Sequence, residues 1–283
     1  MPIASLLAIG NELLNGTVRD ANVFSLSQHL TRMGFSVEYA AMVRDIPQKI
    51  ADVVLFLLAQ QPDVLLCSGG LGPTQDDLTL SALAEALHMP LALNSAATDL
   101  VEYHYDRLLA QQYLTQRGPA FAREKMATLP LGAQPLPNPV GTAPGVKMEH
   151  QGTVIYVLPG VPAELKAIFA ASIVPELLRR FTPGIWAEYT MLVYCDDEAD
   201  LAIPLCDVAQ RHPEVYLKSL AQPFPVASAE GLKVIAVALA ATASEAHAAA
   251  RATLADLRCT AEAVGLRVGE LSTSTDWPEP NRL

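Results

Sequence analysis

The sequence predicts an α/β fold with three layers, built on a mostly parallel sheet and followed by a small α+β domain. Up to Phe181, apolar runs typical of buried strands alternate with amphipathic helical patterns, which favours a parallel sheet with helices on both faces. After Thr182-Pro183-Gly184 the pattern becomes that of a compact α+β arrangement. We therefore expect a first domain over residues 1–181, a second over 184–270 and a flexible tail over 271–283.

The expected elements follow from hydrophobic periodicity, caps and breakers. In the first domain they are strands at 3–9, 37–42, 64–67 and 153–158, and helices at 20–33, 46–59, 78–87, 94–117, 121–127 and 162–181, the last kinked at Pro175. Between 130 and 144, repeated prolines and glycines predict a constrained loop. In the second domain we expect strands at 188–195, 215–220 and 232–240, and helices at 198–210 and 244–264.

Composition limits the class of protein. The 283 residues include 19 basic and 30 acidic side chains, and the net charge of −11 argues against a nucleic-acid partner. Its 4 cysteines form no CxxC pair, which is typical of free thiols in a reducing compartment. No basic leader and no apolar run long enough for a membrane span are present. We expect a cytoplasmic protein with no membrane partner.

The stretch from Cys67 to Asp77, CSGGLGPTQDD, carries the strongest functional signal. Its glycines can adopt positive φ and leave backbone N–H groups open to an oxyanion, and a helix start follows. Two aspartates at that mouth would repel a phosphate unless a divalent cation lay between them. The sequence therefore predicts a phosphate site with a metal ion, with these candidate residues: Gly69, Gly70, Gly72, Thr74, Asp76 and Asp77.

Acidic residues after two other strands are further candidates, each with a structural alternative. Glu12 lies in the GNELLNG turn after the first strand, and a solvated loop acid explains it as well. Asp45 precedes a helix with Pro47 near its start, so that its sequence favours an N-cap. Either Asp76 or Asp77 is likewise suited to cap the next helix, leaving the other for chemistry.

Neutral and basic candidates come later in the chain. Asn138 and Thr142 supply hydrogen-bond groups suited to a ribose or a base, and the adjacent glycines allow close backbone approach. Lys125 or Lys147 could neutralise a second phosphate, although both are ordinary surface cations in the simplest interpretation. The remaining substrate-binding candidates are Gly141, Gly145 and Gly160.

Four ordered segments resemble one family. SGGLGPTQDDLT, GNELLNG, NPVGTAPG and LPGVP together resemble the molybdopterin-binding (MoaB/Mog-like) superfamily, in the form carried by the N-terminal domain of CinA proteins. The resemblance covers about residues 1 to 180. It implies a MoaB/Mog-like fold, a functional aspartate at Asp45, and metal-dependent hydrolysis of ADP-ribose to AMP and ribose 5-phosphate.

Two departures from the CinA pattern limit what is carried over. Nothing after Gly184 resembles the C-terminal domain with which CinA proteins deamidate nicotinamide mononucleotide, so that activity is not expected. Many bacterial members read NRKQA where this chain has REKMA at 123–127, and only Lys125 matches both versions. The contacts to the polar groups of the substrate are therefore left open.

Three functions remain open on the sequence. The first is a metal-dependent hydrolase of a nucleotide pyrophosphate, most simply ADP-ribose, using Asp45, Asp76 and Asp77 with Mg, Mn, Co or Ni. The second is a pterin-handling protein of molybdenum cofactor biosynthesis, and the third is a non-catalytic nucleotide-binding module. The long helix after Asn94 has a mixed surface suited to a subunit contact, and we expect a homo-oligomer, either dimer or trimer.

Overall fold

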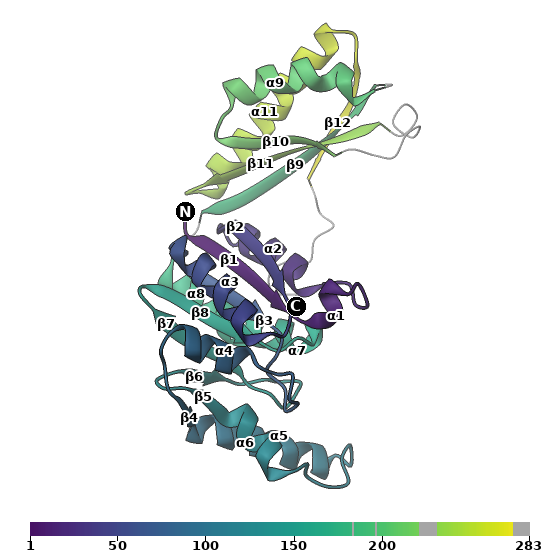
Figure 1. Cartoon of the computed structure of the whole chain (residues 1–283). Coiled ribbons are helices and arrows are strands. Elements are labelled where there is room, and N and C mark those ends of the chain that lie inside the picture. The colour runs from purple at the N-terminus through teal and green to yellow at the C-terminus, as the bar shows by residue number, and fades with distance from the viewer. Residues whose placement is uncertain (183, 196, 221–230, 274–283) are drawn as a thin grey trace. The chain divides into compact units, whose positions relative to one another are not determined.

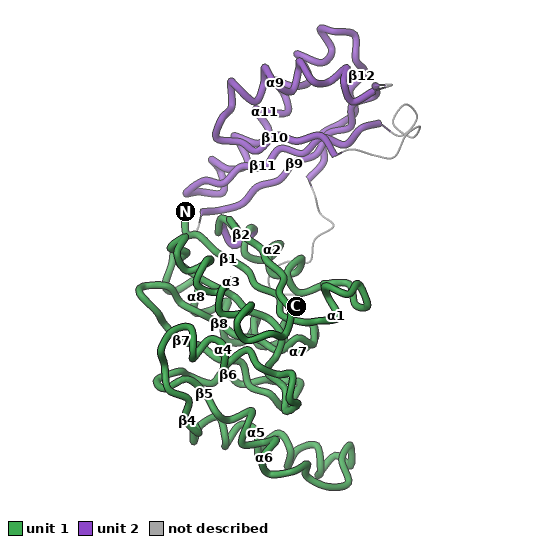
Figure 2. The backbone as a smooth tube through the Cα atoms, viewed as in Figure 1, with its two compact units in different colours: residues 1–31, 35–182, 283 green, residues 32–34, 183–282 purple. Residues whose placement is uncertain are grey.

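The chain divides into two compact units, which Figure 2 shows in different colours. The computed structural model describes residues 1–182, 184–195, 197–220 and 231–273. One unit comprises residues 1–31 and 35–182, and the described residues from 184 on belong, with 32–34, to the other. The predicted tail begins too early, because Leu271 to Thr273 still pair with the neighbouring strand; residues 274–283 lie outside the described part.

The first unit contains these elements, which Figure 1 shows in chain order: β1 (Ile3–Ile9), α1 (Asn11–Leu14), α2 (Asn22–Arg32), β2 (Ser36–Val43), α3 (Pro47–Ala59), β3 (Val64–Ser68), α4 (Thr79–Ala86), β4 (Leu91–Leu93), α5 (Ser95–Ala110), α6 (Ala120–Ala127), β5 (Thr128–Pro130), β6 (Gln134–Leu136), β7 (Gly145–His150), β8 (Thr153–Leu158), α7 (Pro162–Ile168), a π-helical turn (Phe169–Ile173) and α8 (Val174–Arg180). The predicted α/β class is confirmed.

The main sheet has the strand order β2-β1-β3-β8-β7-β6. The first four strands are parallel, and their carboxyl ends therefore meet at one edge. β7 and β6 run antiparallel to their neighbours, and the sequence did not predict them. The prolines of the expected loop are compatible with β6 because it is an edge strand, where a missing N–H leaves no ladder bond unmade.

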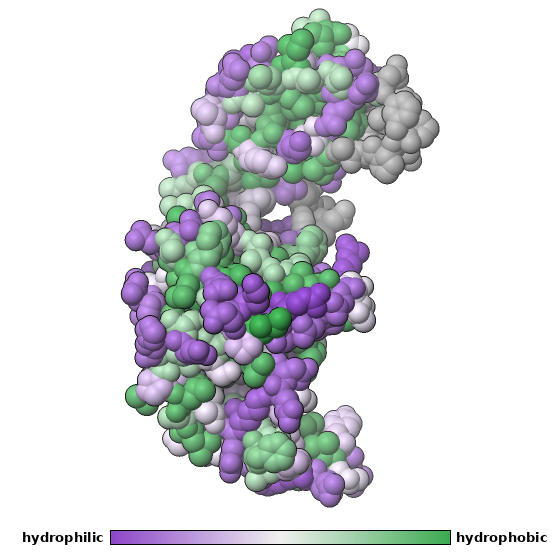
Figure 3. Space-filling view, viewed as in Figure 1, coloured by the Kyte–Doolittle hydropathy of each residue, from purple (hydrophilic) through white to green (hydrophobic). Residues whose placement is uncertain are grey.

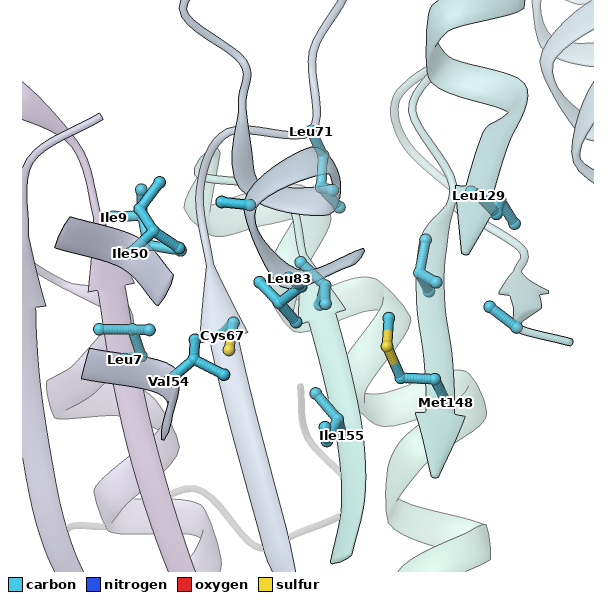
Figure 4. Close-up of a cluster of buried hydrophobic side chains, with 14 of the residues drawn as sticks. Leu7, Ile9, Ile50, Val54, Cys67, Leu71, Leu83, Leu129, Met148 and Ile155 are labelled. Atoms are coloured by element: carbon cyan, nitrogen blue, oxygen red, sulfur yellow. The ribbon is translucent and has the colours of Figure 1, made fainter. Parts of the chain in front are cut away.

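Two apolar layers cover the sheet. On one face, side chains of β1, β3, β7 and β8 pack against α3 and α4, as Figure 4 shows with Leu7, Val54 and Leu83. Side chains alternate along a strand, so that Tyr156 and Leu158, both fully buried, point to the other face. On that face, α2 meets the π-helical turn between α7 and α8, and the ring centroids of His29 and Phe169 lie 5.8 Å apart.

Two helices differ from their predicted extents for local reasons. α5 begins with Asn94 as its N-cap, as predicted, but ends at Ala110 rather than near residue 117. The expected helix from Pro162 is interrupted by the π-helical turn at Phe169–Ile173, which ends two residues before Pro175. Proline lacks the N–H that a continuous α-helix would use there, which accounts for the break.

The described residues of the second unit have the order βαββαβ: β9 (Ile185–Tyr194), a 3₁₀ turn (Glu198–Leu201) leading into α9 (Ala202–Arg211), β10 (Val215–Leu220), β11 (Leu232–Ala240), α11 (Ala243–Ala263) and β12 (Arg267–Thr273). Its antiparallel sheet has the order β10-β11-β9-β12. Leu254 and Leu257 of α11 pack on Val193 and Val234 in its core. The α+β prediction is confirmed, and β12 is a strand that the sequence interpretation missed.

The surface seen in Figure 3 mixes hydrophilic and hydrophobic side chains over both units. Within the described residues, no helix combines the length and the hydrophobicity that crossing a lipid bilayer requires.

Candidate functional site

A cavity of about 440 Å³ lies at the edge where the parallel strands end. Its walls come from the segments that follow β1, β2, β3 and β8, together with Met126 of α6, the loop at 142–143 and the first turn of α7. The structure thus brings most of the predicted site residues together: Glu12, Asp45, Gly69, Gly70, Gly72, Asp76, Asp77, Thr142 and Gly160 all line this cavity. This is the expected place for a ligand in an open parallel sheet.

The glycine turn after β3 is locked in one conformation. Gly69 has φ of +107° and Gly70 of +65°, and a Cβ on Gly69 would lie 2.1 Å from the Ile9 carbonyl oxygen. The Thr79 hydroxyl donates to the Gly69 carbonyl oxygen at 2.8 Å. The turn therefore needs glycine for both its dihedral angles and its close contact with β1.

Three successive backbone N–H groups of this turn remain available to a ligand. The Gly69 N–H is not one of them, because it donates to the Leu158 carbonyl oxygen at 2.9 Å. For Gly70, Leu71 and Gly72, which all line the cavity, no acceptor is found in the described parts of the chain. Successive unpaired amides in a glycine turn are typical of an anion site.

Asp76 and Asp77 are held by Thr74 rather than by the following helix. The N–H of Thr74 donates to Asp77 Oδ2 at 2.8 Å, and its hydroxyl lies within hydrogen-bond distance of both carboxylates. The Thr74 hydroxyl, the backbone N–H of Asp76 and the nearby Lys125 lower the pKa of Asp76. The predicted N-cap role is wrong for both aspartates, since α4 begins after Leu78 with no side-chain cap.

Asp45 is also no N-cap. The residue before α3 is Ile46, and Asp45 Oδ2 instead accepts from the Asn11 N–H at 2.7 Å. Burial raises the pKa of Asp45, and the negative charges of Glu12 and Asp76 raise it further, whereas the Asn11 N–H lowers it. Asp45 therefore faces the cavity as a carboxylate crowded by two others.

The loop candidates divide between the cavity wall and its support. Thr142 lines the cavity, but Asn138 is buried behind it, with Oδ1 accepting from the Val140 and Gly141 N–H groups. Gly141 packs on the Glu164 carboxylate, and Gly145 packs on Ile168, Leu136 and Leu158. Asn138, Gly141 and Gly145 support the loop beside the cavity and are not among the residues that line it, so their contact with a ligand stays a prediction.

The basic candidates also lie outside the cavity wall. Lys125 Nζ donates to the Thr74 carbonyl oxygen, and Lys125 lines a second, smaller hollow that also borders the glycine turn and Asp77. Lys147 pairs with Glu176 and is not available to a phosphate at the cavity. Thr74 itself does not line the cavity either.

Glu164 is the charged residue of the cavity lining that the sequence interpretation missed. It lies in the first turn of α7 and lines the cavity. Its position three residues after the strand-ending Pro159-Gly160-Val161 was a usable signal, because acids at the start of a helix that follows a parallel strand face the ligand edge.

No ready-made metal cage exists in the described residues: no three His, Cys, Asp or Glu side chains gather as a complete ligand set. The donor chemistry nevertheless fits a hard cation, since Asp76 and Asp77 share one turn and Asp45 is close enough to Asp76 for repulsion. The sequence-predicted metal ligands are therefore neighbours that do not converge on one point.

Replacing Asp45 with asparagine is expected to stabilise the protein at pH 7 without divalent cations. A raised pKa means that the native state binds the proton more tightly than the unfolded state, so stability falls as pH rises from about the ordinary value of 3.8 through the raised one. The gain stays below about 1 kcal/mol because solvent screens the half-exposed site. Urea unfolding at pH 4 and pH 7 measures the change in the free energy of unfolding, and Asp99→Asn, at an exposed position, is the control. If both variants changed this free energy equally at both pH values, the raised pKa of Asp45 would be contradicted.

Comparison with known proteins identifies the family. Residues 5–179 match the family model described as "Probable molybdopterin binding domain". A protein of Pyrobaculum calidifontis is 38% identical over 259 residues, which cover 91% of this chain and 95% of that protein. A protein of Thermococcus kodakarensis is 39% identical over 208 residues, covering 74% and 81%.

Among solved structures, the protein CinA from Thermoplasma acidophilum is similar in fold and sequence. It aligns with a TM-score of 0.54 and 30% identity, covering 63% of this chain and 96% of that one. Residues 5–179, which the family model matches, include the glycine turn and the acidic residues of the cavity. This chain belongs to the probable molybdopterin-binding domain family, as a CinA-like member of the MoaB/Mog group.

Proposed function

We propose that the cavity binds a phosphorylated small molecule with the help of a divalent cation. The first candidate for this ligand is molybdopterin. One observation carries the proposal: the unpaired amides of Gly70 to Gly72 and the carboxylates of Asp76 and Asp77 line the same cavity. Amides suit phosphate oxygens, whereas carboxylates repel them unless a cation intervenes. Membership of the molybdopterin-binding family supports the pterin as ligand.

Asp76 and Asp77 would hold the cation, with Asp45 beside them. Mg²⁺ is usually held by one or two carboxylates together with substrate phosphates, so a three-residue cage is not needed. When bound, such a cation neutralises phosphate charge and lowers the pKa of a coordinated water. We propose that this cation is Mg, Mn, Co or Ni.

Hydrolysis of ADP-ribose to AMP and ribose 5-phosphate is the second candidate, and Asp45 favours it. A half-buried carboxylate with a raised pKa in a cavity is suited to act as a general base. In this reaction the oxygen of water bonds to one phosphorus, the bridging P–O bond breaks, and Asp45 takes the proton of the water.

The two candidates are separated by one set of titrations on the full chain. Molybdopterin and ADP-ribose are each titrated calorimetrically with Mg, Mn, Co or Ni and with EDTA, and AMP release is followed in the ADP-ribose samples. Cation-dependent binding of molybdopterin without AMP release supports the first candidate, and AMP release lost in Asp45→Asn supports the second. Binding of neither ligand with any cation would contradict both. Sedimentation of the same samples tests the proposed dimer or trimer.

A further inference from the structure

We propose that Glu164 determines specificity by accepting hydrogen bonds from paired donor groups on the organic part of the ligand. The inference rests on the proposed function, because it assigns the part of the cavity that the phosphate does not occupy. Paired donors occur on the vicinal hydroxyls of a ribose and on the amino-amide edge of a pterin, and this chemistry is what both ligand classes share.

One oxygen of Glu164 is fixed and the other is open. Asn138 Nδ2 donates to Glu164 Oε2 at 2.7 Å. For Oε1, no donor is found among the described residues, and Glu164 is a half-buried residue that lines the cavity. An ionised carboxylate has about four acceptor sites, so the single bond from Asn138 leaves most of them to a ligand.

The loop behind Glu164 is built around its carboxylate. Asn138 is only 1% exposed, and its amide also donates to the Ala143 carbonyl oxygen at 2.8 Å while accepting the N–H groups of Val140 and Gly141. A Cβ on Gly141 would lie 2.2 Å from the Glu164 carboxylate. The buried amide and the bare glycine together hold the carboxylate against the loop, which reduces the side-chain entropy lost on binding.

Stabilisation of the helix dipole does not account for this arrangement. An acidic residue in the first turn of a helix stabilises the helix dipole, but it does so while freely solvated. α7 has 7 residues, and neither the bond from Asn138 nor the contact with Gly141 contributes to that effect. Since a carboxylate repels phosphate, the open oxygen suits the uncharged donors of the ligand.

The test variant is Glu164→Gln. Its amide oxygen can still accept from Asn138, which leaves the NH₂ group facing the cavity, so that the variant presents a donor where the wild type presents an acceptor. Wild type and variant are titrated with inorganic pyrophosphate, ADP-ribose and molybdopterin, each with Mn²⁺. We expect a tenfold to hundredfold loss of affinity for an organic ligand, in line with a hydrogen bond to a charged group, and unchanged affinity for pyrophosphate.

The outcomes separate this inference from the proposed function. Unchanged organic-ligand affinity in Glu164→Gln overturns the inference alone, and an equal loss for pyrophosphate does so too, because it would indicate general damage. If the wild type binds no organic ligand, both proposals fail. Glu164→Asp, which keeps the charge but withdraws it by one methylene, is expected to lose affinity while keeping the preference for the same ligand. The ligand with the larger loss identifies whether a ribose or a pterin is contacted.

Discussion

Gly69→Ala is expected to lower the free energy of unfolding by about 2–6 kcal/mol and to distort the cavity. The residue has φ of +107°, and forcing an L-residue into such a conformation costs about 1–3 kcal/mol. Its new Cβ would also lie 2.1 Å from the Ile9 carbonyl oxygen, and overpacking adds about 1–3 kcal/mol. Because β1 pairs with β2 and β3 on its two sides, Ile9 cannot move away at low cost. Urea unfolding followed by circular dichroism measures the loss.

Gly152→Ala is the matched control. Gly152 has φ of +94°, and a Cβ there meets nothing within 4 Å. It therefore carries the backbone strain without the contact, and a loss of roughly 1–2 kcal/mol is expected. Equal losses in the two variants would mean that the close fit of the glycine turn against β1 contributes nothing to stability, which would contradict the expected difference.

Asp76→Asn and Asp77→Asn are expected to weaken cation-dependent ligand binding about a hundredfold or more. Each variant removes one negative charge from the proposed cation position, and such a cation contributes several kcal/mol to phosphate binding. Asparagine keeps an oxygen that can accept from Thr74, so the turn itself is expected to survive. Calorimetric titration of Mn²⁺ and of each ligand measures the effect without relying on turnover.

The control for this pair is Asp99→Asn, an exposed change on α5 that also removes one charge. It should leave binding unchanged. If it weakened binding as much as Asp76→Asn, the effect would reflect the overall charge of the protein, and no local role could be given to the aspartate turn.

Much of the fold was predictable because the signals are local. Strand and helix periodicity identified the four parallel strands, and their order places the following turns at one edge, so Glu12, Asp45 and the glycine turn could be expected to meet. The antiparallel strands β6 and β7 were not found. Their pairing is a tertiary contact, and the prolines around them are normal in a loop as well as at a sheet edge.

The roles of individual site residues were harder to predict than their location. Asp45 has the sequence context of an N-cap, but its carboxylate accepts from Asn11, 34 residues away, a contact that no local pattern contains. Asn138 looked like a ligand-binding amide and is instead saturated by Glu164 and by its own loop. Glu164 could not be singled out from the sequence, because its contact with Asn138 of that loop joins residues 26 positions apart. Such long-range hydrogen bonds decide which polar residue faces a ligand.

A phosphate beside a cation held by Asp76 and Asp77 is the arrangement on which both candidate functions depend. It is tested most directly by the ³¹P NMR spectrum of ADP-ribose or molybdopterin bound to the protein with Mn²⁺, whose unpaired electrons broaden nearby phosphorus resonances. We expect strong broadening in the wild type that disappears in Asp76→Asn or Asp77→Asn at equal ligand occupancy. Bound ligand with sharp phosphorus resonances, or equal broadening in wild type and both variants, would contradict this arrangement.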